Sequence, residues 1–109
     1  MNRLIKIISI TLIVLNSTLV FAASPDTIVK KEYYKNGQVR IEVPYVEEKK
    51  NGVVKEYYEN GQIRKEIPYD DNVINGIVLE YYPDGALHTE TVFTDGVAGV
   101  TTIYRRRIR

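Results

Sequence analysis

The chain contains no cysteine and no tryptophan, and it has a single histidine and a single methionine among its 109 residues. Without cysteine it can form no disulfide, no thiolate metal site and no acylated-cysteine anchor. His88 is the one histidine, and Ser24 is the last serine along the chain, so a nucleophile with its base cannot be assembled from the repeats. The sequence therefore predicts a protein that is not an enzyme and that holds no metal or cofactor.

An excess of charge of either sign is also lacking, since the formal net charge is +1. A near-neutral chain argues against a nucleic-acid binder that depends on phosphate contacts. The basic residues are nevertheless concentrated at the end of the sequence, at Arg105, Arg106, Arg107 and Arg109. They either protect a sheet edge by charge, which we favour, or contact an anionic surface such as phospholipid headgroups. The second interpretation predicts a peripheral membrane-binding or envelope-binding protein.

The first residues have the pattern of a secretory signal peptide. Arg3 and Lys6 precede an apolar stretch over residues 7–21, and Ala22 closes a motif that signal peptidases cleave. The apolar stretch is short for a membrane span, which disfavours an uncleaved anchor. We expect a signal-peptide helix at residues 1–22, cleavage after Ala22 or, second, after Ala23, and a secreted or periplasmic protein.

The remainder of the chain repeats itself every 24 residues. Residues 31–40 (KEYYKNGQVR) return as residues 55–64 (KEYYENGQIR) and, more loosely, as residues 79–88 (LEYYPDGALH). A fixed period of this size signals a stack of similar small units. We expect a leader at residues 23–28 and a repeat domain at residues 29–109. Its units lie near residues 29–51, 52–75 and 76–98, with a partial unit at residues 99–109.

Each unit reads as a β-hairpin. The tight turns are expected at Asn36-Gly37, Asn60-Gly61 and Asp84-Gly85, because these dipeptides tolerate positive φ. Looser turns are expected at Glu48-Lys49, Asp71-Asn72 and Asp95-Gly96. The strand after each tight turn alternates apolar and polar residues, so Val39, Ile41, Val43 and Tyr45 should share one face, as should Ile63, Ile67 and Tyr69. The predicted fold class is all-β, an elongated antiparallel meander of seven strands in a single-layer sheet.

The register at the tight turns has two possible forms. A two-residue turn pairs Tyr58 with Ile63, whereas a three-residue turn pairs Tyr57 with Ile63 and Glu56 with Arg64. Proline before the third turn favours the three-residue form. That form also places Glu32 opposite Arg40 and Glu80 opposite His88.

The tyrosines are the most conspicuous candidate for a binding surface, and there are nine of them. In the favoured register Tyr33, Tyr57 and Tyr81 lie on the buried side, and Tyr34, Tyr58 and Tyr82 form an aromatic ladder on the outer side. Tyrosine supplies rigid contact area at low entropic cost, so the outer ladder is a candidate protein-contact face. Ordinary cover of the sheet surface is the alternative.

The recurring Glu-Tyr-Tyr-x-Asn/Asp-Gly motif, with a second glycine 15 residues after the turn glycine, resembles the MORN-type repeat in its compact bacterial variant. The resemblance implies β-hairpins and a scaffold or binding role toward proteins or membrane lipids. Bacterial variants are often labelled as antitoxin components of toxin–antitoxin pairs, although an exported chain departs from that pattern. We expect an exported interaction module that binds a protein partner or itself and does not bind nucleic acid.

Overall fold

The structure, a computed structural model, describes residues 25–107. Its strands are β1 (Ile28–Tyr33), β2 (Val39–Val46), β3 (Lys49–Lys50), β4 (Gly52–Tyr57), β5 (Ile63–Asp70), β6 (Val73–Ile74), β7 (Gly76–Tyr81), β8 (Leu87–Thr94) and β9 (Val97–Ile103). Within these residues there is no helix, and so none with the length and hydrophobicity to cross a membrane. The expected signal-peptide helix and its cleavage site lie outside the described residues.

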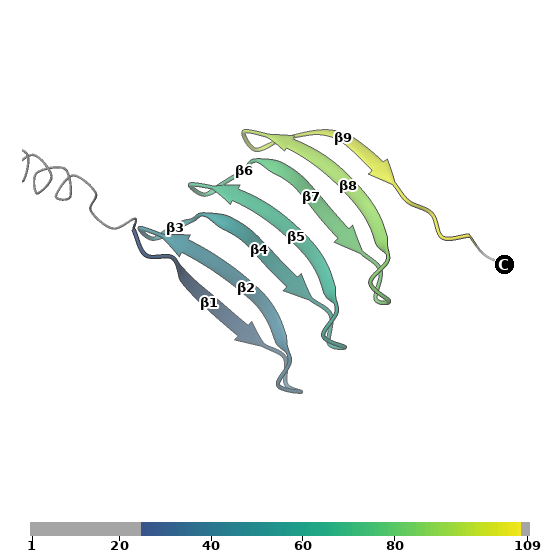
Figure 1. Ribbon diagram of the computed structural model, residues 1–109, viewed down its shortest axis with the longest axis horizontal. Coiled ribbons are helices and arrows are strands. Elements are labelled where there is room, and N and C mark those ends of the chain that lie inside the picture. The colour runs from purple at the N-terminus through teal and green to yellow at the C-terminus, as the bar shows by residue number, and fades with distance from the viewer. Residues whose placement is uncertain (1–24, 108–109) are drawn as a thin grey trace, which may run out of the picture.

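All nine strands belong to one antiparallel sheet with the order β1-β2-β4-β5-β7-β8-β9. The two-residue strand β3 pairs with β2, and the two-residue strand β6 pairs with β5. Figure 1 shows the hairpins side by side along one direction, with no second layer over either face. The predicted single-layer meander is confirmed, and β3 and β6 are short additions to its seven strands.

The sheet has two unlike faces. One face, here called the core face, carries Val54 and Val78, which are 4% and 5% exposed. These are the only buried hydrophobic residues among those described. Val54 lies opposite Ile67 and Val78 lies opposite Thr91, so each valine is covered by side chains of its own sheet. The core is thus a thin layer formed by neighbours within the sheet.

The Asn-Gly and Asp-Gly turns have the three-residue form. The amide of Tyr58 donates to the carbonyl of Gln62 at 2.9 Å, and the amide of Gly61 donates to the carbonyl of Tyr58 at 3.0 Å. Gly61 has a φ of 88°, which a residue with a side chain rarely adopts. The favoured register is confirmed at the turn, where Tyr57 pairs with Ile63.

The turns at the other end of the hairpins are the tighter ones, contrary to the prediction. Val46 pairs with Lys49, so two residues, Glu47 and Glu48, make the first of these turns. Both have positive φ, 48° and 66°, as type I′ hairpin turns require. The turn therefore begins one residue before the predicted Glu48-Lys49. This turn could not be predicted from the sequence, because glutamate rarely adopts positive φ.

A β-bulge follows each three-residue turn and corrects the predicted strand register. Glu56 pairs with Lys65, not with Arg64, so Arg64 is an extra residue in β5. The bulge reverses the side-chain alternation, which places Ile63 on the opposite face from Ile67. The equivalent bulge separates Val39 from Ile41. A period-two pattern cannot reveal one inserted residue, so the predicted common face was wrong at this point.

The last strand is longer than expected. β9 begins at Val97, two residues before the partial unit expected at residues 99–109. In the two preceding units Asn51 and Asn75 interrupt the chain between β3 and β4 and between β6 and β7. No residue takes their place between Ala98 and Gly99, because that spacing is one residue shorter. The two short segments consequently merge into one continuous strand.

Candidate interaction surface

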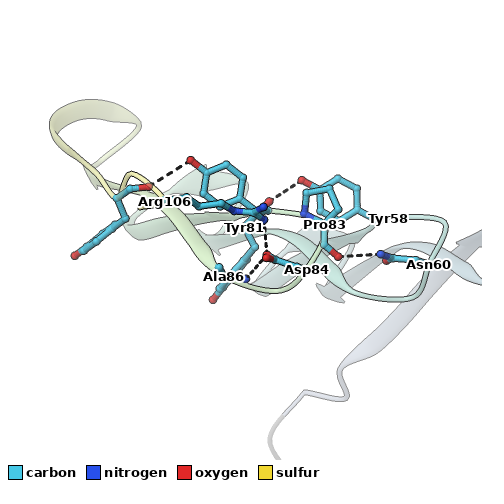
Figure 2. Close-up of polar contacts among 9 residues, drawn as sticks. Tyr58, Asn60, Tyr81, Pro83, Asp84, Ala86 and Arg106 are labelled. Atoms are coloured by element: carbon cyan, nitrogen blue, oxygen red, sulfur yellow. Dashed lines mark hydrogen bonds and ion pairs between the residues drawn. The ribbon is translucent and has the colours of Figure 1, made fainter. Parts of the chain in front are cut away.

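Tyrosine hydroxyls connect each hairpin to the next. Tyr34 donates to the carbonyl of Tyr57 at 2.5 Å, and Tyr58 donates to the carbonyl of Tyr81 at 2.6 Å, the contact drawn in Figure 2. Tyr82 donates to the carbonyl of Tyr104 over a longer 3.3 Å. All three side chains are half-buried. The candidate contact face Tyr34, Tyr58 and Tyr82 is therefore a set of bonds between units, here called the tyrosine staples.

The turn asparagines make a second set of bonds between units. The Asn36 amide donates to the carbonyl of Glu59 at 3.0 Å. The Asn60 amide donates to the carbonyl of Pro83 at 2.8 Å, the contact drawn in Figure 2. The Asn60 side-chain oxygen also accepts from the amide of Gln62 at 2.9 Å, which fixes its own turn. Each asparagine thus stabilises one turn and positions the turn beside it.

The third turn breaks this pattern because Asp84 has no amide to donate. Its carboxylate accepts from the amide of Ala86 at 3.0 Å and from the Arg106 guanidinium at 2.6 Å (Figure 2). The guanidinium also lies 4.3 Å from the centroid of the Tyr82 ring. Arg106, one of the candidate anionic-surface residues, is therefore held against the third turn. Arg105 and Arg107 are exposed, and Arg109 lies outside the described residues.

The face opposite the core face carries tyrosine–glutamate pairs. It is here called the ladder face after these pairs, and the name does not refer to Tyr34, Tyr58 and Tyr82. The Tyr81 hydroxyl donates to the Glu66 carboxylate at 2.7 Å, and the Tyr104 hydroxyl donates to that of Glu90 at 3.0 Å. Burial, and then the bond to Glu66, raise the pKa of Tyr81 to about 12. The bond to Glu90 raises the pKa of Tyr104. These pairs were not predicted from the sequence, although the glutamates recur at the repeat spacing.

The first two units carry the same arrangement in part. Burial, and then the neighbouring Glu42 carboxylate, raise the pKa of Tyr57. Glu42 also forms an ion pair with the Lys31 amine at 3.6 Å. Tyr33 holds the equivalent position in β1, but its side chain is 60% exposed. The expectation that Tyr33, Tyr57 and Tyr81 lie on the buried side is therefore wrong, because the bulges place them on the face opposite Val54 and Val78. Tyr33 is the most exposed of the three because it lies in an edge strand.

The ladder face also carries a row of exposed apolar side chains, here called the hydrophobic row: Val29, Val53, Ile77 and Val92. Their exposed fractions lie between 43% and 52%. Val29, Val53 and Ile77 occupy the same position in three successive units, and Val92 lies opposite Ile77. The prolines at positions 44 and 68 lie opposite the two valines and extend the row. This surface was not predicted from the sequence.

Charged residues on the core face pair with one another across units. The Lys65 amine lies 2.9 Å from the Glu80 carboxylate, which leaves His88 without the predicted glutamate partner. The His88 ring instead lies 4.3 Å, centroid to centroid, from the Tyr82 ring. Glu80 pairs in register with Thr89, since the bulge shifts β8 by one residue. Among the described residues, no three histidine, aspartate or glutamate side chains gather as metal ligands.

Comparison with known proteins identifies the repeat. The family described as MORN repeat variant matches residues 27–47, 50–71 and 74–95, three successive segments that each span one hairpin. Neither the curated proteins nor the solved structures gave a match. The matched segments cover more than half of the chain, and MORN repeats are commonly modules that interact with proteins or membranes. The chain therefore belongs to the MORN repeat variant family.

Proposed function

We propose that the protein is an exported, non-enzymatic interaction module that binds a protein partner across the ladder face of its open sheet. The hydrophobic row is the observation that carries this proposal. Its apolar side chains recur at one repeat position, stay about half exposed and lie opposite Pro44, Pro68 and Val92, and exposed apolar patches mark interaction sites. A single-layer sheet exposes this face along its whole length (Figure 1).

The chemistry around the hydrophobic row suits a protein surface. The carboxylates of Glu42, Glu66 and Glu90 border it, and the amine of Lys31 lies beside the first of them. Protein interfaces combine an apolar centre with a polar rim, and tyrosine is enriched within them. Tyr33, 60% exposed on the same face, adds an aromatic contact at the N-terminal edge.

The tyrosine staples are a weaker choice of contact surface. The hydroxyls of Tyr34 and Tyr58 already bind backbone carbonyls of the chain, so a partner would meet only part of each ring. Two variants separate the surfaces: V53K/I77K alters the hydrophobic row, and Y34F/Y58F/Y82F removes the staple hydroxyls. We expect partner binding to be lost in the first variant and retained in the second.

Site-specific photocrosslinking in cells provides the test. A photoreactive amino acid at Val53 and, separately, at Ile77 should yield the same crosslinked protein, identified by mass spectrometry. The same probe at the exposed turn residue Glu59 is the matched control. Crosslinking at the two row positions that does not exceed the control would refute the proposal, as would crosslinking from Val53 that survives I77K or crosslinking from Ile77 that survives V53K. Mass spectrometry of the purified protein tests export through the predicted N-terminus at Ala23.

A membrane-binding function is the second candidate, and the exposed Arg105 and Arg107 support it. Basic residues near an anionic bilayer each contribute about 1 kcal/mol of attraction, which salt screens. Sedimentation with anionic liposomes at low and high salt, with and without residues 105–109, tests it. Binding that depends on these residues and weakens in salt supports the electrostatic interaction, whereas binding that ignores both excludes it.

A further inference from the structure

The two outer edges of the sheet differ in composition. β1 carries Lys30, Lys31 and Glu32 among its six residues. β9 carries no charged residue and no proline among its seven, VAGVTTI. Charge and proline are the usual means by which proteins keep a sheet edge from pairing with another chain. The β1 edge is thus protected by charge within the strand. The arginines that we expected to protect a sheet edge, Arg105 and Arg107, follow β9 and leave its seven residues uncharged.

β9 is also a better strand for pairing than its counterparts. In the earlier units Gly52 and Gly76 have φ values of 116° and 126°, which bend the chain where each strand starts. Gly99 is not among the positive-φ residues, so β9 runs as one strand from Val97 to Ile103, with a bulge at Gly99 and Val100 in its pairing with β8. No strand within residues 25–107 pairs with its outer side. The backbone donors and acceptors of that side are consequently available to another strand.

Val97 and Val100 of β9 are more exposed than any apolar side chain of the β1 edge, where Ile28 is 62% exposed. Val97 is 70% exposed, Val100 is 75% exposed and Ile103 is 59% exposed. The corresponding Val29 in β1 is 49% exposed and Val53 in β4 is 43% exposed. Pairing a further strand with β9 would remove part of this apolar surface from water, which favours association.

We infer that the outer edge of β9 pairs, antiparallel, with the same edge of a second copy of this chain. This inference rests on the proposed function as an interaction module and names one partner for it. The resulting two-fold pair would extend the sheet of each copy into one continuous sheet. Each copy would retain its own ladder face for the protein partner proposed above.

Charge complementarity selects a second copy as the occupant. Asp95 lies in the turn just before β9, and Arg105 and Arg107 follow its end. Antiparallel pairing of two identical strands brings the start of one beside the end of the other. Acidic and basic flanks therefore meet at both ends, and no register within the strand sets like charges opposite each other. The same pairing at β1 would bring Lys30 and Lys31 close to their own copies.

Charge substitutions at equivalent positions of the two edges test the inference. V100K places a lysine in β9, and V29K places one at the same repeat position of β1. In analytical ultracentrifugation over a concentration series, the processed wild-type protein should form a dimer. V29K should retain the dimer and V100K should lose it, with unchanged circular dichroism in both. A wild-type protein that stays monomeric, or a V100K dimer as tight as wild type, overturns the inference.

Disulfide mapping provides an independent readout, because the chain has no cysteine of its own. Opposed residues of an antiparallel pair have Cα atoms about 4.5–5.5 Å apart, which is within disulfide range. Single cysteines at Val100, Thr101 and Thr102 should give a disulfide-linked dimer under mild oxidation for at least one position, and Val29→Cys should not. Equal crosslinking at Val29 contradicts the assigned edge. V100K leaves Val53 and Ile77 unchanged, and V53K/I77K leaves β9 unchanged, so failure of self-pairing leaves the crosslinking test of the protein partner intact.

Discussion

The junctions between successive units are not all alike, and the last one differs from the first two. Between the first three units, an asparagine amide and a tyrosine hydroxyl donate to backbone carbonyls of the next unit at distances from 2.5 to 3.0 Å. At the last junction an aspartate binds Arg106, and the Tyr82 hydroxyl lies 3.3 Å from its carbonyl. The comparison shows that hydrogen bonds from side chains to the backbone connect successive units of the array. Where the sequence replaces the turn asparagine with aspartate, an ion pair takes the place of one of these bonds.

The same contrast extends to burial. Val54 and Val78, in the second and third units, are nearly inaccessible, whereas β9 has no buried residue. A repeat contacts only its neighbours, so a unit with one neighbour buries less than a unit with two. The end of the array is therefore the less stable part, and it is also the part with an edge open to pairing.

The largest expected difference is in the stability lost when a valine is shortened to alanine in the middle units and in β9. Val78→Ala removes two buried methyl groups and leaves a cavity, so we expect unfolding to become easier by roughly 2 kcal/mol. Val100→Ala, at an exposed position, should change the stability by less than about 0.5 kcal/mol. Urea denaturation followed by circular dichroism measures both, at protein concentrations where V100A and wild type are monomeric. Equal losses in the two variants contradict a core located in the middle units.

Loss of a tyrosine staple should likewise cost more stability in the middle units than at the last junction. Tyr58→Phe removes a half-buried hydrogen bond of 2.6 Å, and we expect a loss of about 1 kcal/mol. Tyr82→Phe removes a bond of 3.3 Å and should cost clearly less, because the longer bond is weaker. Both substitutions keep the ring and its packing. A larger loss in Y82F than in Y58F would show that the last junction is the stronger one.

Much of this fold could be predicted from the sequence, because the turn dipeptides and the alternating strands both act locally. Asn60-Gly61 specified its turn and Pro83 indicated the three-residue form. The bulge at Arg64 could not be predicted, since a single inserted residue leaves composition and periodicity almost unchanged. The two-residue turn at Glu47-Glu48 was likewise hidden by residues that seldom adopt positive φ.

The candidate surface was less predictable than the fold. Tyr34, Tyr58 and Tyr82 were recognised from their abundance, but their bonds connect residues 22 or 23 positions apart and depend on how units stack. The hydrophobic row was not predicted, because each bulge reverses the alternation of side chains between the two faces. Without the positions of the bulges, the residues that share a face cannot be assigned. Exposure, which distinguishes Val53 from the buried Val54 beside it, is a property of the assembled sheet.

Exchanging the turn residues of the two kinds of junction should have a moderate effect. Asn60→Asp retains the oxygen that accepts from Gln62 but loses the donor to Pro83, and we expect a loss of about 0.5–1 kcal/mol. Asp84→Asn weakens an exposed ion pair with Arg106 and should cost about 0.5 kcal/mol or less. Thermal unfolding at low and high salt measures both, and the loss in Asp84→Asn should shrink as salt rises because the lost contact is an ion pair.

Alkaline pH should produce the smallest and most specific effect, at the Tyr81–Glu66 pair. The pKa of Tyr81 is about 12 in the folded chain and 10.0 ordinarily. Because the folded value is the higher one, the stability from this pair is complete below pH 10 and is lost as pH rises toward 12. Tyr81→Phe should flatten that part of the pH dependence. Ultraviolet titration should show one late-ionising tyrosine disappear in the variant, and an unchanged titration would contradict the pairing.

Residue-resolved amide hydrogen exchange tests most directly the claim that the array is held together in its middle units and open at β9. For monomeric V100K, we predict the slowest exchange in β4, β5 and β7 and fast exchange at the outward-facing amides of β9. In wild-type protein the β9 amides should become protected as concentration rises. Protection in monomeric β9 equal to that in β5, or equally fast exchange in all strands, would contradict the account.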